Sequence, residues 1–350
     1  MSLLEDRYRH VLRLLPASYR AGREEEMVSA FLEGSADLSD EDAPRPRWSE
    51  IASVAALSVR VRLGGTGAAP RFLAWGDAVR LVAVLGLGFS ATLGCVWFGA
   101  FLDRYGLFGP PSAGQADLGP GGSAGRLWDI AQGFANLLWL AAFAALVRGR
   151  LRAAKALVPL ALAATCAGVL GQVATDRDAA LSGLVLQGVL LAVPVLALAA
   201  GFHRDAPRTR HPAWVAALPA ATGVLLYGLL TLLGVWSAGP VADPRAWSWV
   251  WPWLDEPGLA CLALLAAGVA CLRRRERTFA LPMALAILTV PVALARILRL
   301  DPRGADPATQ TVAAVNAGQI IALVLCGVTL AVLAVRAMPA RAPLAEEGPR

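Results

Sequence analysis

The chain has 350 residues, of which 57% are hydrophobic and only 17% charged, and its mean hydropathy is +0.55. Soluble globular proteins are about 25% charged, so this composition excludes an ordinary soluble protein and predicts a membrane protein. The net charge of +6 does not indicate nucleic-acid binding, because the Arg residues sit in short turns between apolar runs rather than on one continuous basic face.

Residues 1 to 70, called the prefix below, are too polar to cross a membrane and predict a small cytoplasmic domain. Residues 34 to 47 within it are mostly small, acidic or Pro, which is typical of a linker. The core that short amphipathic helices can share is small, so the prefix is expected to be marginally stable alone. Three such helices are expected, at Leu4–Leu15, Tyr19–Leu32 and Ser49–Leu63.

The run YRHVLRLLPASYRAGREEEM, from Tyr8 to Met27, resembles the amino-terminal helical prefix of a group of uncharacterised actinobacterial multi-spanning membrane proteins. It is also similar in outline to the small cytoplasmic permease-prefix or HAAS-like domains that precede membrane spans. The resemblance covers roughly the first 65 residues. It implies a cytoplasmic regulatory or docking module, and it brings no catalytic residues.

Residues 71 to 336 predict an all-α, polytopic membrane bundle of about eight transmembrane helices, and residues 337 to 350 a disordered cytoplasmic tail. Each apolar run approaches the roughly 20 residues that cross a bilayer, except the sixth, which has 16. The predicted spans are Val79–Leu102, Leu127–Val147, Ala153–Ala174, Ala180–Phe202, Ala213–Trp236, Pro257–Leu272, Phe279–Leu300 and Thr311–Val335.

Charge asymmetry predicts a multi-pass protein of the cell membrane with both termini in the cytoplasm. The three turns assigned to the inner side carry 11 bases and 2 acids, whereas the four outer loops carry 6 bases and 9 acids. Arg and Lys are enriched in cytoplasmic loops, so the basic turns mark the inner side. The clearest is RGRLRAAK, residues 148 to 155, which directly follows the second span.

Eight polar residues inside the spans are candidates for the lining of a functional cavity. Two interpretations stay open: amides between helices can be packing contacts worth about 0.6 kcal/mol each, or the set lines an outward-open polar cavity. In the predicted topology all eight fall in the outer half of the membrane or near its midplane: Asp129, Gln132, Asn136, Gln172, Gln187, Arg296, Asn316 and Gln319.

Asp129 and Arg296 are the only opposite charges clearly inside the predicted spans, and the sequence predicts that they pair. Each charge alone would be costly in hydrocarbon, so an ion pair between the second and seventh spans is the lower-energy arrangement. The alternative is that each side chain separately reaches the outer headgroups. The second span is predicted as one unbroken helix, in which Asp129, Gln132 and Asn136 share a face.

Four Trp residues alternate in the loop before the sixth span, at Trp247, Trp249, Trp251 and Trp253. Alternation favours an extended chain, and Pro252 within the run agrees with that prediction. The segment is interpreted either as an aromatic belt that anchors the loop at the outer interface, or as an outer lid over an outward-facing cavity.

No residue cluster indicates a metal or a cofactor, and none is expected. The five Cys residues lie singly in apolar spans without a CxxC motif, and the three His residues lie outside the spans. The sequence has no Walker A motif, so the chain is not expected to be an ATPase. The expected partners are the lipid bilayer and a cytoplasmic protein that binds residues 1 to 70, and nucleic acid is not one of them.

Two function classes stay open, and a third is remote. The first is a non-enzymatic membrane protein of regulatory or sensory type, whose prefix docks a cytoplasmic partner. The second is a transporter or permease component that uses the outward-facing polar cavity. The third is a lipid-linked glycosyl transferase, which commonly needs an acid just after its first span. Asp103 has that position, but the outer loops are small for an acceptor site.

Overall fold

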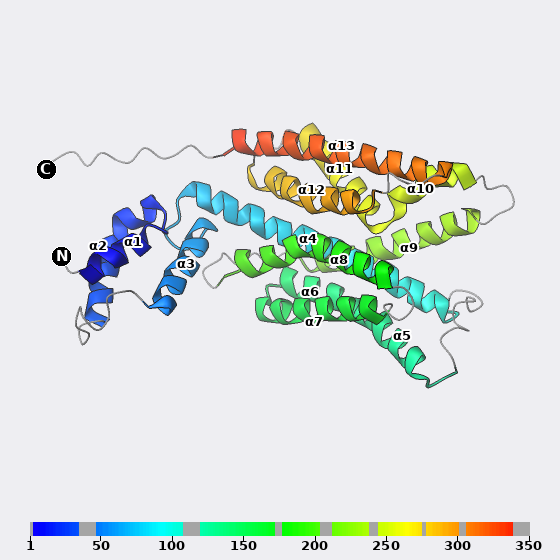
Figure 1. The fold of residues 1–350 in the computed structure, drawn as a ribbon, viewed down its shortest axis with the longest axis horizontal. Coiled ribbons are helices and arrows are strands. Elements are labelled where there is room, and N and C mark those ends of the chain that lie inside the picture. The colour runs from blue at the N-terminus through cyan, green and yellow to red at the C-terminus, as the bar shows by residue number, and fades with distance from the viewer. Residues whose placement is uncertain are drawn as a thin grey trace.

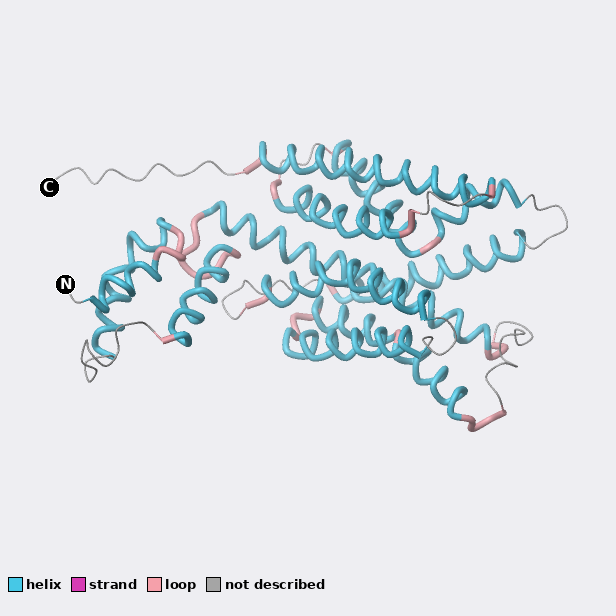
Figure 2. The backbone as a smooth tube through the Cα atoms, viewed as in Figure 1, coloured by secondary structure: helices cyan, strands magenta, loops and turns pink. Residues whose placement is uncertain are grey.

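The computed structural model of the chain describes residues 3–34, 47–107, 120–171, 177–203, 212–237, 244–274, 278–300 and 306–338. Within these ranges the protein consists of helices joined by short loops and turns, without a strand (Figure 2). Eight helical spans are long and apolar enough to cross a membrane, which confirms the predicted all-α bundle. A smaller group of three helices stands at one end of it (Figure 1).

The prefix contains the three predicted helices, α1 (Leu3–Leu12), α2 (Ala17–Gly34) and α3 (Trp48–Arg62). Their apolar stripes meet in a small core that includes Tyr8, Leu12 and Val61. On α3, the Ser58 hydroxyl donates to the carbonyl oxygen of Leu14 over 2.6 Å. This bond satisfies a carbonyl of the turn that follows α1, and it ties α3 to that turn.

An ion pair joins α1 to α2 on the surface of the prefix. The guanidinium of Arg9 donates to both carboxylate oxygens of Glu25, over 2.8 and 2.9 Å. These hydrogen bonds favour the ionised carboxylate, so they hold the pKa of Glu25 below its ordinary value. The Glu25 side chain is mostly exposed, so the pair contributes little to stability.

The bundle has an even number of spans, so α4 begins and α13 ends at the same end, beside the prefix (Figure 1). We call this the prefix end and the opposite one the distal end. A short further helix, α10 (Pro244–Leu254), lies at the distal end before α11. The spans are α4 (Pro70–Arg104), α5 (Ala124–Ala135) with α6 (Leu137–Val147), α7 (Leu151–Leu170), α8 (Arg177–Gly201), η3 (Ala213–Ala217) with α9 (Leu218–Ser237), α11 (Glu256–Arg273), α12 (Ala280–Leu298) and α13 (Pro307–Arg336).

The central helix of the bundle is α4, which packs against α6, α8, α9 and α12. Its 35 residues are about 52 Å long at a rise of about 1.5 Å each, which exceeds the hydrocarbon thickness. Its first turns nevertheless pack within the bundle: Ala78 is fully buried, and the ring of Trp75 meets the edge of Phe279 with centroids 5.1 Å apart. One continuous helix therefore connects the prefix to the bundle interior.

The second span is interrupted at Asn136, where α5 ends and α6 begins. The predicted span from Leu127 to Val147 is present as one apolar stretch, Ala124–Val147, and Asn136 is a single turn residue within it whose backbone stays in the right-handed helical region. The Asn136 side chain donates to the carbonyl oxygen of Gln132 over 3.1 Å, so it competes with the backbone for that acceptor. The carbonyl oxygen of Asn136 also lies directly against Gly94 of α4, at a place that a Cβ would occupy.

Candidate functional site

At the distal end, α10 and α11 meet at a corner that gathers several of the polar groups of the bundle. Since α10 ends at Leu254 and α11 begins at Glu256, only Asp255 lies between them. A helix leaves its last carbonyl oxygens and its first N–H groups without partners inside the helix. At this corner both kinds of group lie close together within a membrane-spanning bundle, so side chains must satisfy them.

Asp255 satisfies the start of α11. Its Oδ1 accepts a hydrogen bond from the backbone N–H of Gly258 over 2.8 Å, which makes Asp255 the N-cap residue. Pro257 is tolerated in this first turn, because an N–H there would have no helical partner. At the end of α10, the carbonyl oxygen of Pro252 accepts hydrogen bonds from two side chains: from Gln319 Nε2 over 3.1 Å, and from Arg296 Nη2.

Arg296 links the two helix ends from its position on α12, and it has no exposed surface. Its Nη1 donates to Asp255 Oδ2 over 3.0 Å and its Nη2 to Asp255 Oδ1 over 2.6 Å. Nη1 also donates to Asn316 Oδ1 of α13 over 3.2 Å. A bidentate pair of this kind makes a buried guanidinium tolerable. We call Pro252, Asp255, Arg296, Asn316 and Gln319 the corner network.

Gly258 is required for the close packing of this network. A Cβ at Gly258 would overlap both the Pro252 carbonyl oxygen and Nη2 of Arg296. On the exposed side of the network, Arg299 Nη1 lies 2.5 Å from Asp255 Oδ2, and the Arg299 side chain is 39% exposed. Asp255 thus has one buried and one exposed cationic partner, and only the buried one is surrounded by protein.

The predicted ion pair between Asp129 and Arg296 is wrong. Asp129 of α5 pairs with Arg104 at the end of α4, with Nη1 and Oδ1 2.5 Å apart, while Arg296 pairs with Asp255. Both Arg104 and Asp255 fall outside the spans predicted from the apolar runs. The apolar runs alone therefore do not identify Arg104 or Asp255 as a partner inside the membrane. The folded helices nevertheless bring Arg104 beside Asp129 and Asp255 beside Arg296.

The structure brings three of the eight polar candidates together, namely Arg296, Asn316 and Gln319 in the corner network. Gln132 lies against Gly168 of α7, and Asn136 bonds to its own helix. Gln187 of α8 donates to Glu256 Oε2 over 2.7 Å. The eighth candidate, Gln172, lies outside the described residues. Gln132 therefore faces α7 and Asn136 faces α4, and among the described residues neither forms a hydrogen bond to the corner network.

The four Trp residues lie on a helix, α10, and the prediction of an extended chain is wrong. Residues at every second position of a helix fall on two opposite stripes, and Trp247 and Trp251 form one of them, with ring centroids 5.6 Å apart. A helix is favoured because it satisfies its own backbone at the membrane boundary, where the described chain offers no strand to pair with. Trp249 and Trp251 are exposed, whereas Trp253 packs on the main core.

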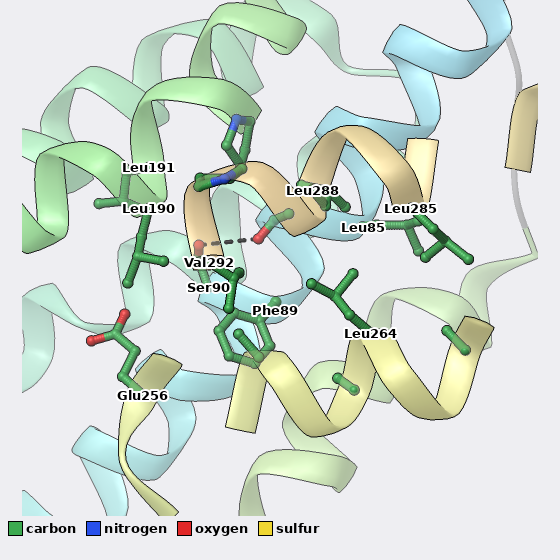
Figure 3. A pocket seen from close by; sticks show the side chains of 16 residues that line it. Leu85, Phe89, Ser90, Leu190, Leu191, Glu256, Leu264, Leu285, Leu288 and Val292 are labelled. Carbon is green, nitrogen blue, oxygen red and sulfur yellow. Dashed lines mark hydrogen bonds between the residues drawn. The ribbon is translucent and has the colours of Figure 1, made fainter. Parts of the chain in front are cut away.

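An apolar cavity of about 170 Å³ lies between α4, α8, α11 and α12 (Figure 3). Of its lining residues only Glu256 carries a charge, and the hydroxyl of Ser90 is satisfied by the carbonyl oxygen of Gly86 at 3.1 Å. None of the four Trp side chains lines it. The lining is Leu85, Gly86, Phe89, Ser90, Leu190, Leu191, Pro194, Glu256, Ala260, Ala263, Leu264, Ala267, Leu285, Leu288, Pro291 and Val292.

The cavity is elongated, and the carboxylate of Glu256 marks its distal end. From Glu256 to Ala267 the lining follows α11 over 11 steps along the helix, or about 16 Å. Figure 3 shows Glu256 beside Leu190, across the cavity from Leu85 and Leu285. The space is therefore apolar along most of its length and acidic at one end.

Asp255 and Glu256 are not among the candidates predicted from the sequence, because the predicted sixth span begins at Pro257. The signal that could have found them is local: an acidic residue followed by Pro is a helix-start pattern, and it would have moved the start of α11 to Glu256. The role of Glu256 in a cavity has no such local signal, since three other helices make the remaining walls.

No protein-family model, curated protein or solved structure matches this chain. The likeness of the prefix to permease-prefix domains accordingly stays a prediction from residues 8 to 27.

Proposed function

We propose that this chain is a non-enzymatic sensory protein of the cell membrane, in which the prefix docks a cytoplasmic protein according to the state of the bundle. One observation carries the proposal: α3 contacts both α4 and α8. These are two of the four helices that line the apolar cavity. A change in the cavity would therefore act on helices that also touch the prefix.

The connection between α3 and α4 supports this coupling. It is short, and Gly64 adopts a φ of +82°, which favours glycine. Gly76 of α4 lies so close to the carbonyl oxygen of Leu63 that a Cβ would overlap it. From there α4 continues as one helix to Gly86 and Ser90 in the cavity wall. A shift of α4 at the cavity would move the surface on which α3 rests.

The prefix also offers a surface suited to a protein partner. Trp48, at the start of α3, is 84% exposed, and a large aromatic side chain of this kind is a frequent anchor in protein interfaces. The orientation we propose places this surface in the cytoplasm, because the basic turn of Arg148, Arg150 and Arg152 lies at the same end of the bundle.

A transporter is the second candidate, and the positions of two prolines favour it. Pro194 lies inside α8 and Pro291 inside α12, and both line the cavity. Proline removes a backbone hydrogen bond, so these helices are weakened at the level of the cavity. Interrupted helices beside a binding site are a feature of many transporters.

A crosslinking experiment on the full-length protein in its native membrane tests the sensor. A photo-reactive residue at Trp48 should trap one defined cytoplasmic protein, whereas the same residue at Gly121, near the distal end, should not. A second position in the exposed part of α3, Val59, should trap the same protein. If solute flux depends on the cavity and no crosslink is specific to the prefix, the sensory function is contradicted and the transport function is supported.

A further inference from the structure

We propose that the apolar cavity binds a small hydrophobic molecule that carries a protonated amine, with the ammonium group on Glu256 and the apolar body along α11. The inference rests on the proposed function, since it names the chemical class of the ligand that the sensor would detect. Three observations lead to it: the surroundings of the Glu256 carboxylate, the shape of the cavity and its opening.

The Glu256 carboxylate has an amide partner, but no ion pair within 4.0 Å among the described residues includes it. Its Oε2 accepts from Nε2 of Gln187, a neutral donor, over 2.7 Å. The ion pairs within 4.0 Å among the described residues do not include Glu256, and the nearby Arg296 and Arg299 both bind Asp255 instead. A carboxylate in apolar surroundings is unfavourable without a cation. A ligand ammonium group would supply the missing charge.

The shape of the cavity favours a narrow apolar body. Its volume, about 170 Å³, is similar to that of an apolar cavity of roughly 150 Å³ that binds benzene. Its walls are mainly Leu, Ala, Val, Phe and Pro side chains, which offer a ligand dispersion contacts and no further charge. A short alkyl chain or one small ring fits these dimensions, with a single polar group at one end.

The opening of the cavity favours a ligand that reaches it through the membrane. Ala263 of α11 lines the cavity and is also exposed on the side of the bundle. Leu190, on the facing helix α8, is only partly buried. The cavity is thus reached sideways between α8 and α11, where lipid chains would surround the bundle. A molecule that partitions into the bilayer can take this path.

Three eight-carbon probes separate the contribution of charge from that of the apolar body. Saturable binding to the purified full-length protein in phosphatidylcholine nanodiscs is measured, with empty nanodiscs as the blank. Octylamine should bind at least tenfold more tightly than octanol, because a charge-assisted hydrogen bond is stronger than a neutral one, and octanoate should not bind. Equal binding of octylamine and octanol, or binding of octanoate, would overturn the proposal.

Two pairs of variants test the site itself. Glu256→Gln can still bond to Gln187, and it should bind octylamine only as weakly as octanol, whereas Glu26→Gln on the exposed face of α2 should bind like the unaltered protein. Ala263→Phe fills the opening and should abolish binding of both probes, whereas Ala266→Phe, exposed on α11 but outside the cavity lining, should not. Unchanged octylamine binding by Glu256→Gln, in protein with unaltered thermal unfolding, would refute the site.

The amine has two sources, a free hydrophobic amine or the ethanolamine headgroup of a lipid. Phosphatidylethanolamine added to the nanodiscs will compete with octylamine if the lipid is the source and will not compete if the ligand is free. The crosslink at Trp48 distinguishes a failure of the amine site from a failure of the sensory function. Octylamine binding without any change in that crosslink would refute the sensor alone, and a regulated crosslink without amine binding would refute the ligand alone.

Discussion

Arg296 of α12 holds both carboxylate oxygens of Asp255, the single residue between α10 and α11, at 2.6 and 3.0 Å. The same guanidinium donates to the carbonyl oxygen of Pro252 in the last turn of α10. One buried side chain therefore neutralises the N-cap residue of α11 and caps the C-terminus of α10. Because these roles converge on one residue, the corner should be sensitive to small chemical changes.

Asp255→Asn should destabilise the bundle by about 3–5 kcal/mol, because it leaves the buried guanidinium of Arg296 without a counter-charge. Arg299→Gln should cost about 0–1 kcal/mol, since Arg299 is partly exposed to solvent. Reversible unfolding of the purified protein in detergent measures both values. If the two variants lower the free energy of unfolding equally, the buried Asp255–Arg296 pair contributes no more to stability than the exposed Asp255–Arg299 pair.

Gly258→Ala should destabilise the protein by several kcal/mol, because the added Cβ overlaps two members of the corner network. Gly318→Ala on α13 is the matched control, since no atom lies within 4 Å of its Cβ position. The control should be neutral or stabilising by about 0.5–1 kcal/mol, as expected for Gly to Ala in a helix. Thermal unfolding that ranks the two variants in the opposite order would contradict the packing described here.

Arg104 and Asp129 should show coupling in a double-mutant cycle of Arg104→Gln and Asp129→Asn. We expect about 0.2–1 kcal/mol, because Arg104 is 41% exposed and the pair is screened. The swap Asp129→Arg with Arg296→Asp should restore nothing, since the two residues have different partners. Recovery of stability by that swap would show that they do meet.

Reporter fusions test the orientation of the bundle. Fusions at Gly121, Gly149 and Met338 should report outside, inside and inside, because Gly149 lies in a basic turn at the prefix end and Gly121 is near the distal end. An outside signal at both Gly149 and Met338 would invert the orientation and place the prefix outside the cytoplasm. Different signals at these two sites would mean an odd number of crossings between them.

The sequence by itself determined the class of fold. Apolar runs near 20 residues, separated by turns such as residues 148 to 155, predicted eight spans, and eight are present among the residues that the structure describes. The amphipathic stripe through Tyr8 and Leu12 likewise predicted the first prefix helix. These features are local: a helix that crosses hydrocarbon must satisfy its own backbone, so its length and composition are written in consecutive residues.

Only the tertiary structure decided which residues meet. The pairing of Asp129 and Arg296 was predicted because they were the only opposite charges within the apolar runs, yet each found a partner just beyond a predicted span. The Trp alternation predicted an extended chain, but the segment is the helix α10, because the described chain offers no strand with which an extended segment could pair. Contacts between helices depend on their relative rotation and offset, which side-chain packing between segments far apart in the sequence determines.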